Sequence, residues 1–204
     1  MADQRPKGSV KSARTTFRIL EELKERTEAT LTEIAEEFDL SRSSVHNYLS
    51  TLESEGYVIK DGNTYRIGLR FLEFGGHARH NEHIYHIARE EVTDLAKETG
   101  EMSNLLIEEQ GKGVYLFRAR GERAVQTDTY IGERVHLHNT ALGKSILAHL
   151  PRQRVEEIID RHGLPAATER TITDRDELYE ELERVREDGV AFDDEARFEG
   201  QRCV

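Results

Sequence analysis

The chain has 204 residues, of which 36% are hydrophobic and 34% charged, and its formal net charge is −11. No apolar run approaches the ~20 residues of a membrane span, residues 1–10 lack the apolar stretch of a signal peptide, and the single cysteine, Cys203, excludes an internal disulfide and a CxxC metal cage. These features predict a soluble cytoplasmic protein of one large or two small domains, with no membrane partner.

The acidic charge is unevenly distributed along the chain. Residues 1–75 carry 11 basic and 13 acidic side chains, a net charge of −2, whereas residues 76–204 carry 18 and 27, a net charge of −9. The N-terminal part therefore tolerates a polyanion better, although a basic solvated tail would have the same composition. An acidic chain in which Arg outnumbers Lys by 22 to 7 also fits a high-salt cytoplasm, as in a halophilic archaeon. Five basic residues near the start have no carboxylate between them: Arg5, Lys7, Lys11, Arg14 and Arg18.

Two helices with one buried face each are predicted first. Ser12 and Thr32 are candidate N-caps, because their side-chain oxygens can accept a backbone N–H bond. Apolar residues then recur every three or four positions. The residues expected to be buried are Phe17, Ile19, Leu20 and Leu23 in the first helix and Leu31, Ile34, Ala35 and Phe38 in the second.

A third helix and a β-hairpin follow. The helix is predicted to start at Ser41, again a capping residue, and to end at Gly56. Residues 57–60 and 64–67 read as two strands joined by the turn at residues 61–63. Three helices and a hairpin make a winged helix-turn-helix. The third helix is expected to bury Val45, Tyr48 or Leu49, and Leu52.

The turn between the second and third helices has the spacing of a helix-turn-helix. Such a unit needs a small residue where the helices cross, a residue in the turn that tolerates the left-handed conformation, and a branched apolar residue as anchor. Ala35, Asp39 and Val45 meet these requirements, since Asp is among the few residues that adopt this conformation readily.

The outward side of the third helix carries polar residues near its N-terminal half, the part of a recognition helix that meets base edges. Arg42 could bond guanine and Asn47 adenine, each with two hydrogen bonds, and the serines could bond a base or a phosphate. Lys11, Arg14 and Lys60 would hold phosphates. A solvated helix face, a winged helix used only for protein contact and an ordinary hairpin surface remain alternatives. The predicted DNA-binding residues are Lys11, Arg14, Ser41, Arg42, Ser43, Ser44, His46, Asn47, Ser50, Lys60 and Asn63.

After the apparent joint at Gly75-Gly76, the pattern predicts an α+β domain in which helices lie on a sheet. It opens with a helix over residues 81–99 that Gly100 closes. Strands are predicted at 102–108, 114–120, 125–130 and 135–137, helices at 140–150, 152–161 and 175–188, and a last strand from Val190. The first of these helices is expected to turn inward Ile84, Ile87, Ala88, Val92 and Leu95.

Two sets of motifs resemble the IclR family of transcription regulators over residues 9–204. The first set is LTEIA at 31–35, SRSSV at 41–45 and LESEGYV at 52–58, and the second is VHLHNTALGK at 135–144, GVAFDDE at 189–195 and GQRC at 200–203. The resemblance implies a winged helix-turn-helix DNA-binding domain at 1–68, a linker helix at 69–80 and a GAF-like effector-binding domain at 81–204. That domain would have a mixed or antiparallel sheet with flanking helices.

The resemblance also implies an effector site built from Thr127, Val135, the backbone of Ala141 and Leu142, Asp193 and Cys203. The residues themselves support an anion site, because a helix capped by Asn139 or Thr140 presents free N–H groups at its start. The carboxylate of Asp193, beside the start of this helix, would repel a carboxylate ligand unless the ligand also offers a hydroxyl. A sugar acid or sugar is therefore expected. Thr127 and Val135 could also be plain sheet residues, Asp193 a turn residue and Cys203 a small buried hydrophobe.

Other chemistry is less well supported. Gly143-Lys144-Ser145 ends like a phosphate loop, but the glycine required five positions earlier is His138. No nucleophile is paired with a base, so an enzyme with an accessory winged helix is only a rival hypothesis. No cofactor is expected. A metal site is not expected either, because a spacing of three residues spreads four side chains over half a helix. Those four are His77, His80, His83 and His86.

These observations predict a transcription regulator that binds a pseudo-palindromic operator as a dimer or dimer of dimers and responds to a small organic effector. Recognition helices would enter major grooves about 34 Å apart. The chain stops at Val204, in what reads as the middle of a strand, whereas the family continues through more strand and a closing helix. We therefore expect a shortened effector domain, and a DNA-binding protein that no longer senses a ligand is the alternative.

Overall fold

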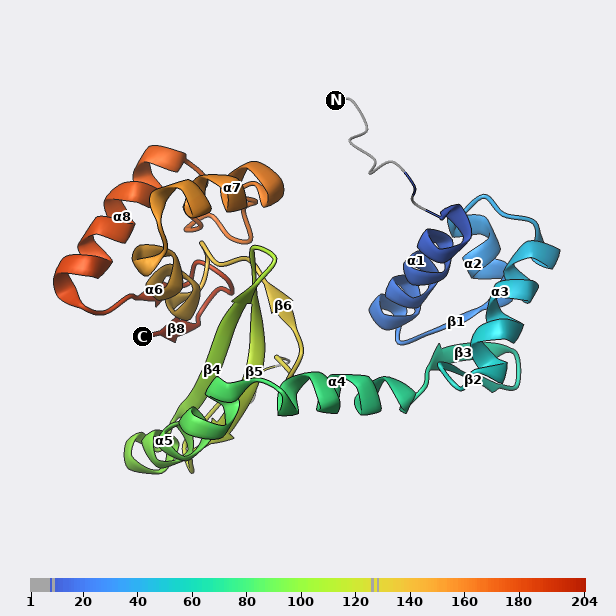
Figure 1. The fold of residues 1–204 in the computed structure, drawn as a ribbon, viewed down its shortest axis with the longest axis horizontal. Helices are drawn as coiled ribbons and strands as arrows, with labels where there is room; N and C mark the ends of the chain where they lie inside the picture. Colours follow the sequence, from blue (N-terminus) through green and yellow to red (C-terminus); the bar gives the residue numbers. More distant parts are fainter. Residues whose placement is uncertain (1–7, 9, 126, 128) are drawn as a thin grey trace. The chain divides into compact units, whose positions relative to one another are not determined.

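The computed structural model describes residues 8, 10–125, 127 and 129–204. The chain forms two compact units, Met1–Ala78 and Arg79–Val204 (Figure 1). Within the described residues, no helix is both long and apolar enough to cross a membrane. Together the two units have the α+β composition that the sequence predicts.

The first unit is a winged helix-turn-helix, as predicted. Its three helices pack beside an antiparallel sheet in the order β1-β3-β2, in which β2 and β3 are the hairpin of the wing. The short strand β1 was not expected from the sequence and pairs with β3. The elements are α1 (Lys11–Arg26), β1 (Glu28–Thr30), α2 (Leu31–Glu37), α3 (Arg42–Ser54), β2 (Val58–Asp61) and β3 (Thr64–Ile67).

One hydrophobic core holds this unit together. Ile19 and Leu23 of α1, Ile34 of α2, and Val45 and Leu49 of α3 are all fully buried in it. The turn before α3 has the predicted left-handed residue, with φ of 49° at residue 39. Helix α3 then starts as expected, because the N-cap side chain at position 41 accepts a hydrogen bond from the N–H of residue 44.

Both predicted caps of the first two helices are wrong. Helix α1 begins one residue before Ser12, after an N-cap without a side-chain bond. Helix α2 is capped by Thr30 rather than Thr32, because Glu33 completes a capping box: its Oε2 accepts from the Thr30 N–H at 2.7 Å, and the Thr30 hydroxyl accepts from the Glu33 N–H at 3.3 Å. Phe17 is 64% exposed, since it lies about 200° around the helix from the buried Ile19.

The predicted joint at Gly75-Gly76 lies two residues before the boundary between the two units, which follows Ala78, but its glycines do not interrupt the helix there. Both residues lie inside helix α4 (Arg70–His80). The start of this helix packs on the hairpin, with the rings of Phe71 and Tyr57 5.1 Å apart and the guanidinium of Arg70 4.8 Å from the Tyr57 ring. Two glycines lower helix propensity without ending a helix.

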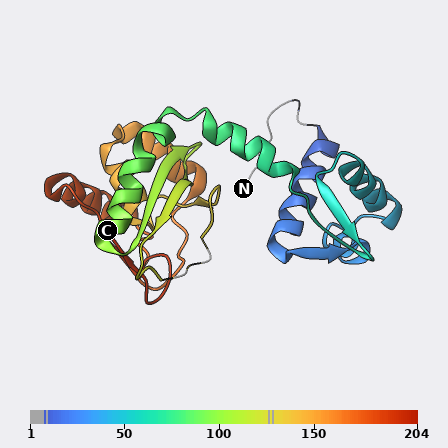
Figure 2. The same ribbon diagram turned by 90° about the horizontal axis from the view of Figure 1, so that it is seen from below.

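The second unit is an antiparallel sheet with helices packed on it (Figure 2). Strands β4, β5 and β6 lie in that order, α5 contacts β4 and β5, and α6 contacts β4 and packs on α8. A separate two-stranded sheet joins β7 and β8. The elements are α5 (His83–Thr99), β4 (Met102–Glu109), β5 (Lys112–Arg120), β6 (Arg134–Val135), α6 (Ala141–His149), α7 (Arg152–His162), α8 (Arg175–Asp188), β7 (Asp193–Asp194) and β8 (Arg202–Cys203).

Helix α5 presents only part of the predicted face to the sheet: Ala88 and Val92 are half-buried, but the three larger residues expected beside them are exposed. Ile84, Ile87 and Leu95 are 40%, 58% and 51% exposed, whereas Ala96 is buried. A side chain at Gly121, directly after β5, would lie 2.4 Å from the carbonyl oxygen of Ala96, so the backbone approaches the end of the helix closely here. The inward side also carries Tyr85, whose ring lies 6.0 Å from that of Phe117 on β5.

The strand predictions were partly right. Strands β4 and β5 and the three later helices confirm the expected elements. The strand expected at 125–130 is absent at 125, 127, 129 and 130, and residues 126 and 128 lie outside the described residues. The strand expected at 135–137 is reduced to β6, and the last strand starts at Asp193 rather than Val190.

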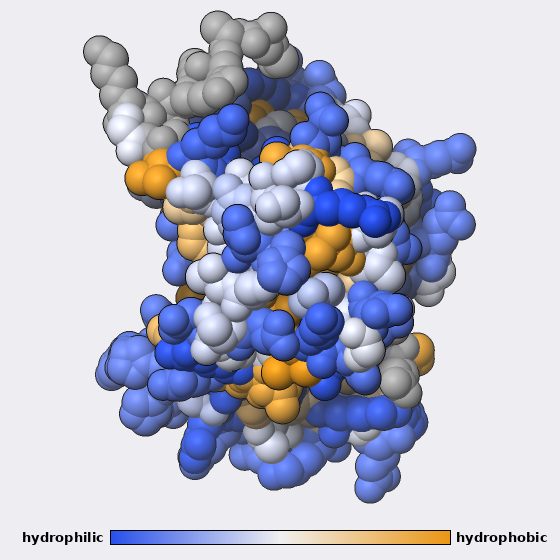
Figure 3. Space-filling model, turned by 90° about the vertical axis from the view of Figure 1, so that its right-hand side faces the viewer, coloured by the Kyte–Doolittle hydropathy of each residue, from blue (hydrophilic) through white to orange (hydrophobic). Residues whose placement is uncertain are grey.

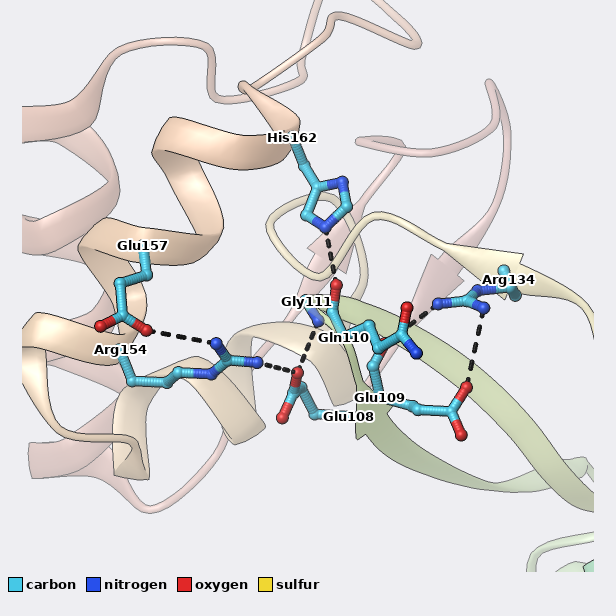
Figure 4. A network of polar contacts seen from close by, with 8 residues as sticks. All are labelled: Glu108, Glu109, Gln110, Gly111, Arg134, Arg154, Glu157 and His162. Atoms are coloured by element: carbon cyan, nitrogen blue, oxygen red, sulfur yellow. Dashed lines mark hydrogen bonds and ion pairs between the residues drawn. The ribbon is translucent and has the colours of Figure 1, made fainter. Parts of the chain in front are cut away.

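Helix α7 is tied to the turn between β4 and β5 (Figure 4). Arg154 donates to Glu108 Oε1 at 2.8 Å, and the same oxygen accepts the Gly111 N–H at 2.6 Å. At the other end of the helix, His162 Nε2 lies 2.8 Å from the carbonyl oxygen of Gln110. These contacts fix the turn against the helix and hold one end of the second unit together.

Candidate DNA-binding and effector-binding sites

Helix α3 has one buried side and one polar side. Val45 and Leu49 are 0% exposed. Arg42, Ser43 and Asn47 are exposed. The side that the core leaves open therefore carries the hydrogen-bonding groups that base recognition requires.

Several of the serines have structural roles at the same time. The hydroxyl of Ser41 caps α3 and lies 2.8 Å from the hydroxyl of Ser44, so both side chains are engaged at the start of the helix. The Ser50 hydroxyl lies 3.4 Å from His46 Nδ1, one turn away. A serine hydroxyl that already has one protein partner can still take a second partner in DNA.

Arg42 has a partner on another helix. Its Nη2 donates to Thr32 Oγ1 at 2.8 Å. Thr32 was not among the expected DNA-binding residues, because no local pattern shows that the first turns of α2 and α3 meet. Only the fold brings these two side chains together.

The expected phosphate contacts lie on other elements of the first unit. Lys11 and Arg14 are exposed in the first turn of α1, whereas Arg5 and Lys7 of the same basic run lie outside the described residues. Lys60 lies on β2 with its ammonium 5.6 Å from the ring of Tyr65, and Asn63 is exposed in the turn that follows. The space-filling view in Figure 3 shows a largely hydrophilic face with small hydrophobic patches.

Five of the six expected effector residues lie in one region of the second unit. Val135 and Ala141 belong to its hydrophobic core, and Leu142 and Cys203 pack against that core. Asp193 pairs with Cys203 across the two strands β7 and β8. Because these residues come from four separate segments, the fold, not the local sequence, is what assembles this region.

The sixth residue, Thr127, is held by an arginine. Its hydroxyl accepts a hydrogen bond from Arg118 Nη2 at 2.8 Å, and Arg118 Nε donates to Asn104 Oδ1 at the same distance. The guanidinium of Arg118 also lies 5.9 Å from the ring of Tyr115, which belongs to the core of this unit. Arg118 thus links Thr127 to the sheet.

The start of α6 is capped by Thr140, one of the two expected capping residues. Its hydroxyl accepts from the Gly143 N–H at 3.0 Å. The N–H groups of Ala141 and Leu142 have no acceptor within the helix, because the first turn of any helix leaves its donors without intrahelical partners. Beside them, Asn139 is 6% exposed, and its Oδ1 has no hydrogen-bond partner among the described residues.

Asp193 and Lys144 are buried charged residues near this helix. Asp193 is 3% exposed and accepts from the Ala196 N–H at 2.8 Å. Burial raises the pKa of its carboxyl group, and the charge of Lys144 opposes that shift. Lys144 is 5% exposed and lies 2.5 Å from Glu181 Oε1 on α8, so its ammonium has a carboxylate partner.

A cavity of about 420 Å³ opens next to this region. Among the residues that the structure describes, none of the six expected effector residues lines it, although neighbours of Asp193 do. The cavity is lined in part by His138, Lys144, Glu181, Val185, Phe192 and Asp194.

Burial raises the pKa of the Cys203 thiol, so this residue is a poor nucleophile.

The histidines form contacts of other kinds. His136 Nε2 lies 2.7 Å from Lys112 Nζ. Burial, together with the positive charges of Lys112, His138 and His162, lowers the pKa of His136 from 6.5 to about 4. Where α4 ends and α5 begins, His86 Nε2 lies 2.7 Å from the carbonyl oxygen of His80. Within the described part of the chain, no three His, Cys, Asp or Glu side chains are grouped as a metal site requires.

Two family models match almost the entire chain. The IclR helix-turn-helix domain matches residues 12–62, and the C-terminal domain of bacterial IclR transcriptional regulators matches residues 76–204. These matches fall on the first unit and the second unit, respectively, apart from the first three residues of the second match.

Individual proteins agree with these models. The chain is 34% identical over 199 residues to the probable HTH-type transcriptional regulator ArcR of Halobacterium salinarum, covering 96% of this chain and 76% of the relative. The crystal structure of Thermotoga maritima IclR is 32% identical, with a TM-score of 0.68 over 92% of this chain and 76% of that one. An IclR homologue of Microbacterium hydrocarbonoxydans, solved in complex with 4-hydroxybenzoate, shares the fold at 21% identity, with a TM-score of 0.68 over 92% of this chain and 78% of that one. The chain therefore belongs to the IclR family of DNA-binding transcription regulators.

Proposed function

We propose that this chain binds a pseudo-palindromic operator as a dimer or dimer of dimers, that a small organic effector controls the binding, and that the chain itself catalyses no reaction. It would act in the cytoplasm, where its DNA target lies. The observation that carries the proposal is the division of α3 into a buried apolar side and an exposed polar side. A rigid helix seated on a core in this way can enter a major groove.

Within this proposal, DNA contacts divide into two classes. Arg42, Ser43 and Asn47 would read base edges, because Arg and Asn can make paired hydrogen bonds to guanine and adenine. Lys11 and Lys60 would hold phosphates, together with Arg14, and would set the orientation of the unit without reading sequence. The remaining predicted contacts, Ser41, Ser44, His46, Ser50 and Asn63, would supplement both classes.

The proposed effector is a small carboxylate or sugar derivative that also carries a hydroxyl. The free N–H groups of Ala141 and Leu142 suit a carboxylate. The buried Oδ1 of Asn139 is an acceptor without a partner among the described residues, and such a group favours a ligand that offers a donor. Asp193 would accept a second ligand hydroxyl, and Thr127, Val135 and Cys203 would complete the walls.

Regulation requires the effector to favour one arrangement of the DNA-binding units over another. A coupling free energy of about 1–3 kcal/mol would change operator affinity roughly 5- to 150-fold. An effector that binds both arrangements with equal affinity would leave operator binding unchanged.

The test combines DNA selection with ligand screening. The full chain is used to select duplexes from a random pool, and the affinity for the selected duplex is then measured with a library of sugars and carboxylates. We expect a palindromic consensus and at least one compound that changes the affinity. Failure to enrich any sequence would contradict the proposed function.

A second candidate function is DNA binding without ligand control. It is favoured by the packing of the expected effector residues, because Val135 and Ala141 are buried in the core and, of the described residues, none of the six lines the neighbouring cavity. Thermal melting with the same library separates the two functions. A sequence-specific chain whose melting temperature no compound raises would support this second function.

A further inference from the structure

The hydrogen bond between Arg42 and Thr32 joins the first turns of two helices. Arg42 is the first residue of α3 and is exposed, whereas Thr32 is the second residue of α2 and is half-buried. The Arg42 Nη2 donates to Thr32 Oγ1 at 2.8 Å. Thr32 takes no part in the capping box of α2, which Thr30 and Glu33 complete. Its hydroxyl is therefore available to the guanidinium.

We infer that Thr32 is a positioning residue that orients the guanidinium of Arg42 for its contact with a base pair. This inference rests on the proposed function, in which α3 enters the major groove. An arginine side chain has many rotamers, and binding a base fixes one of them at an entropic cost. A hydrogen bond that exists before DNA arrives reduces this cost and directs the side chain.

The chemistry of the pair suits this role. A guanidinium has five N–H donors, so one bond to Thr32 leaves enough donors for a paired contact with the O6 and N7 atoms of guanine. A hydroxyl is also uncharged. Among the described residues, no ion pair to Arg42 is present, so the positive charge is kept for DNA rather than neutralised by a carboxylate.

Thr51 supplies a matched control on α3 itself. It is an exposed threonine whose Oγ1 donates to the Asn47 carbonyl oxygen at 2.8 Å. It lies about 180° around the helix from Arg42. Thr51→Val therefore removes a hydroxyl of the same kind without affecting the Arg42 side chain.

The experiment is a double-mutant cycle on the full chain with the duplex that the wild type selects. Affinities are measured for this duplex and for duplexes changed at single base pairs, using Thr32→Val, Thr32→Ser, Arg42→Ala, the double variant Thr32→Val/Arg42→Ala, and Thr51→Val. We expect Thr32→Val to lower discrimination about three- to tenfold at the base pair whose recognition Arg42→Ala relaxes. Thr32→Ser should preserve discrimination, and the double variant should match Arg42→Ala.

Three results would overturn the inference while leaving the proposed function intact. Thr32→Val could weaken all duplexes equally, which would make Thr32 a phosphate contact. The effects of the two substitutions could add independently. Thr32→Val could also leave discrimination between duplexes unchanged, as the control Thr51→Val is expected to do. A wild-type chain that selects no sequence would instead contradict the proposed function, and the inference with it.

Discussion

Asn47 lies on the exposed side of α3, one and a half turns beyond the capped start of the helix. An Asn side chain can pair with the N6 and N7 atoms of adenine, and such a pair provides about 1–3 kcal/mol of discrimination against other bases. Lys60, on the hairpin, has only a point charge to offer. The two residues should therefore contribute to DNA binding in different ways.

We expect Asn47→Ala to lower the preference for the selected duplex over a duplex changed at one base pair by about 1–3 kcal/mol. Lys60→Ala should instead weaken selected and random duplexes alike and reduce the steepness of the salt dependence. Titration of both variants with both duplexes at several salt concentrations measures this. Equal behaviour of the two variants would refute the division into base and phosphate contacts.

His136 should make the stability of the second unit depend on pH. Its pKa is lowered from 6.5 to about 4 in the folded chain. The unfolded chain therefore binds more protons in this interval, and stability should fall as pH falls from about 6.5 toward 4. His136→Gln should reduce the loss of melting temperature across the interval. If the melting temperatures of the wild type and this variant fell equally as the pH was lowered, His136 would not be responsible for the loss.

Single residues were predictable where their neighbours in sequence determine their role. Ser41 caps α3 and residue 39 adopts the left-handed conformation, as the local pattern indicates. The cap of α2 was missed although its signal was present, because Thr30 stands three residues before Glu33. The pairing of Thr32 with Arg42 has no local signal at all.

Among the elements, helices with a strong apolar stripe were predicted best. The period of 3.6 residues identified α2 and α3, whose buried residues come from that stripe. For α5 it predicted the helix but only part of the inward face, since Ile84, Ile87 and Leu95 remain exposed. Strands of two or three residues, such as β1 and β6, are too short to show a period of two.

The turn between β4 and β5 depends on a glycine. Gly111 has a φ of +84°, and a Cβ there would lie 2.7 Å from the ring of His162, which contacts the neighbouring carbonyl oxygen (Figure 4). Gly189 also has a positive φ, +71°, but a Cβ there would have nothing within 4 Å. The two glycines differ mainly in their surroundings.

We expect Gly189→Ala to cost about 1–2 kcal/mol of unfolding free energy, the cost of a left-handed non-glycine residue. Gly111→Ala should cost more, because His162 must also move and lose its contact with Gln110. Chemical denaturation of both variants measures the difference. A Gly111→Ala variant as stable as Gly189→Ala would contradict the packing of α7 on this turn.

At the scale of the whole molecule, the net charge of −11 opposes association with DNA. Each phosphate contact contributes about −0.9 to the slope of log affinity against log salt. We expect a shallow slope, because a chain with so much acidic charge would rely mainly on base contacts. Affinities for the selected duplex from low to high salt give the slope. A slope as steep as that of six or more phosphate contacts would contradict this expectation.

The winged helix-turn-helix could be predicted, with its recognition helix, because its elements follow one another closely in sequence. The effector region could not be predicted in this way, because β5 and β6, the start of α6, and β7 and β8 contribute to it from far apart in the chain. Residue types could suggest an anion site at α6. Packing and cavity lining in that unit could come only from the structure.

One measurement tests most sharply whether the exposed side of α3 reads DNA. The affinity of the variant Arg42→Ala/Ser43→Ala/Asn47→Ala is determined for the selected duplex and for random duplex at one salt concentration. We expect this variant, still folded by circular dichroism and melting, to bind both duplexes equally. A folded variant that keeps the wild-type preference for the selected duplex would contradict this expectation.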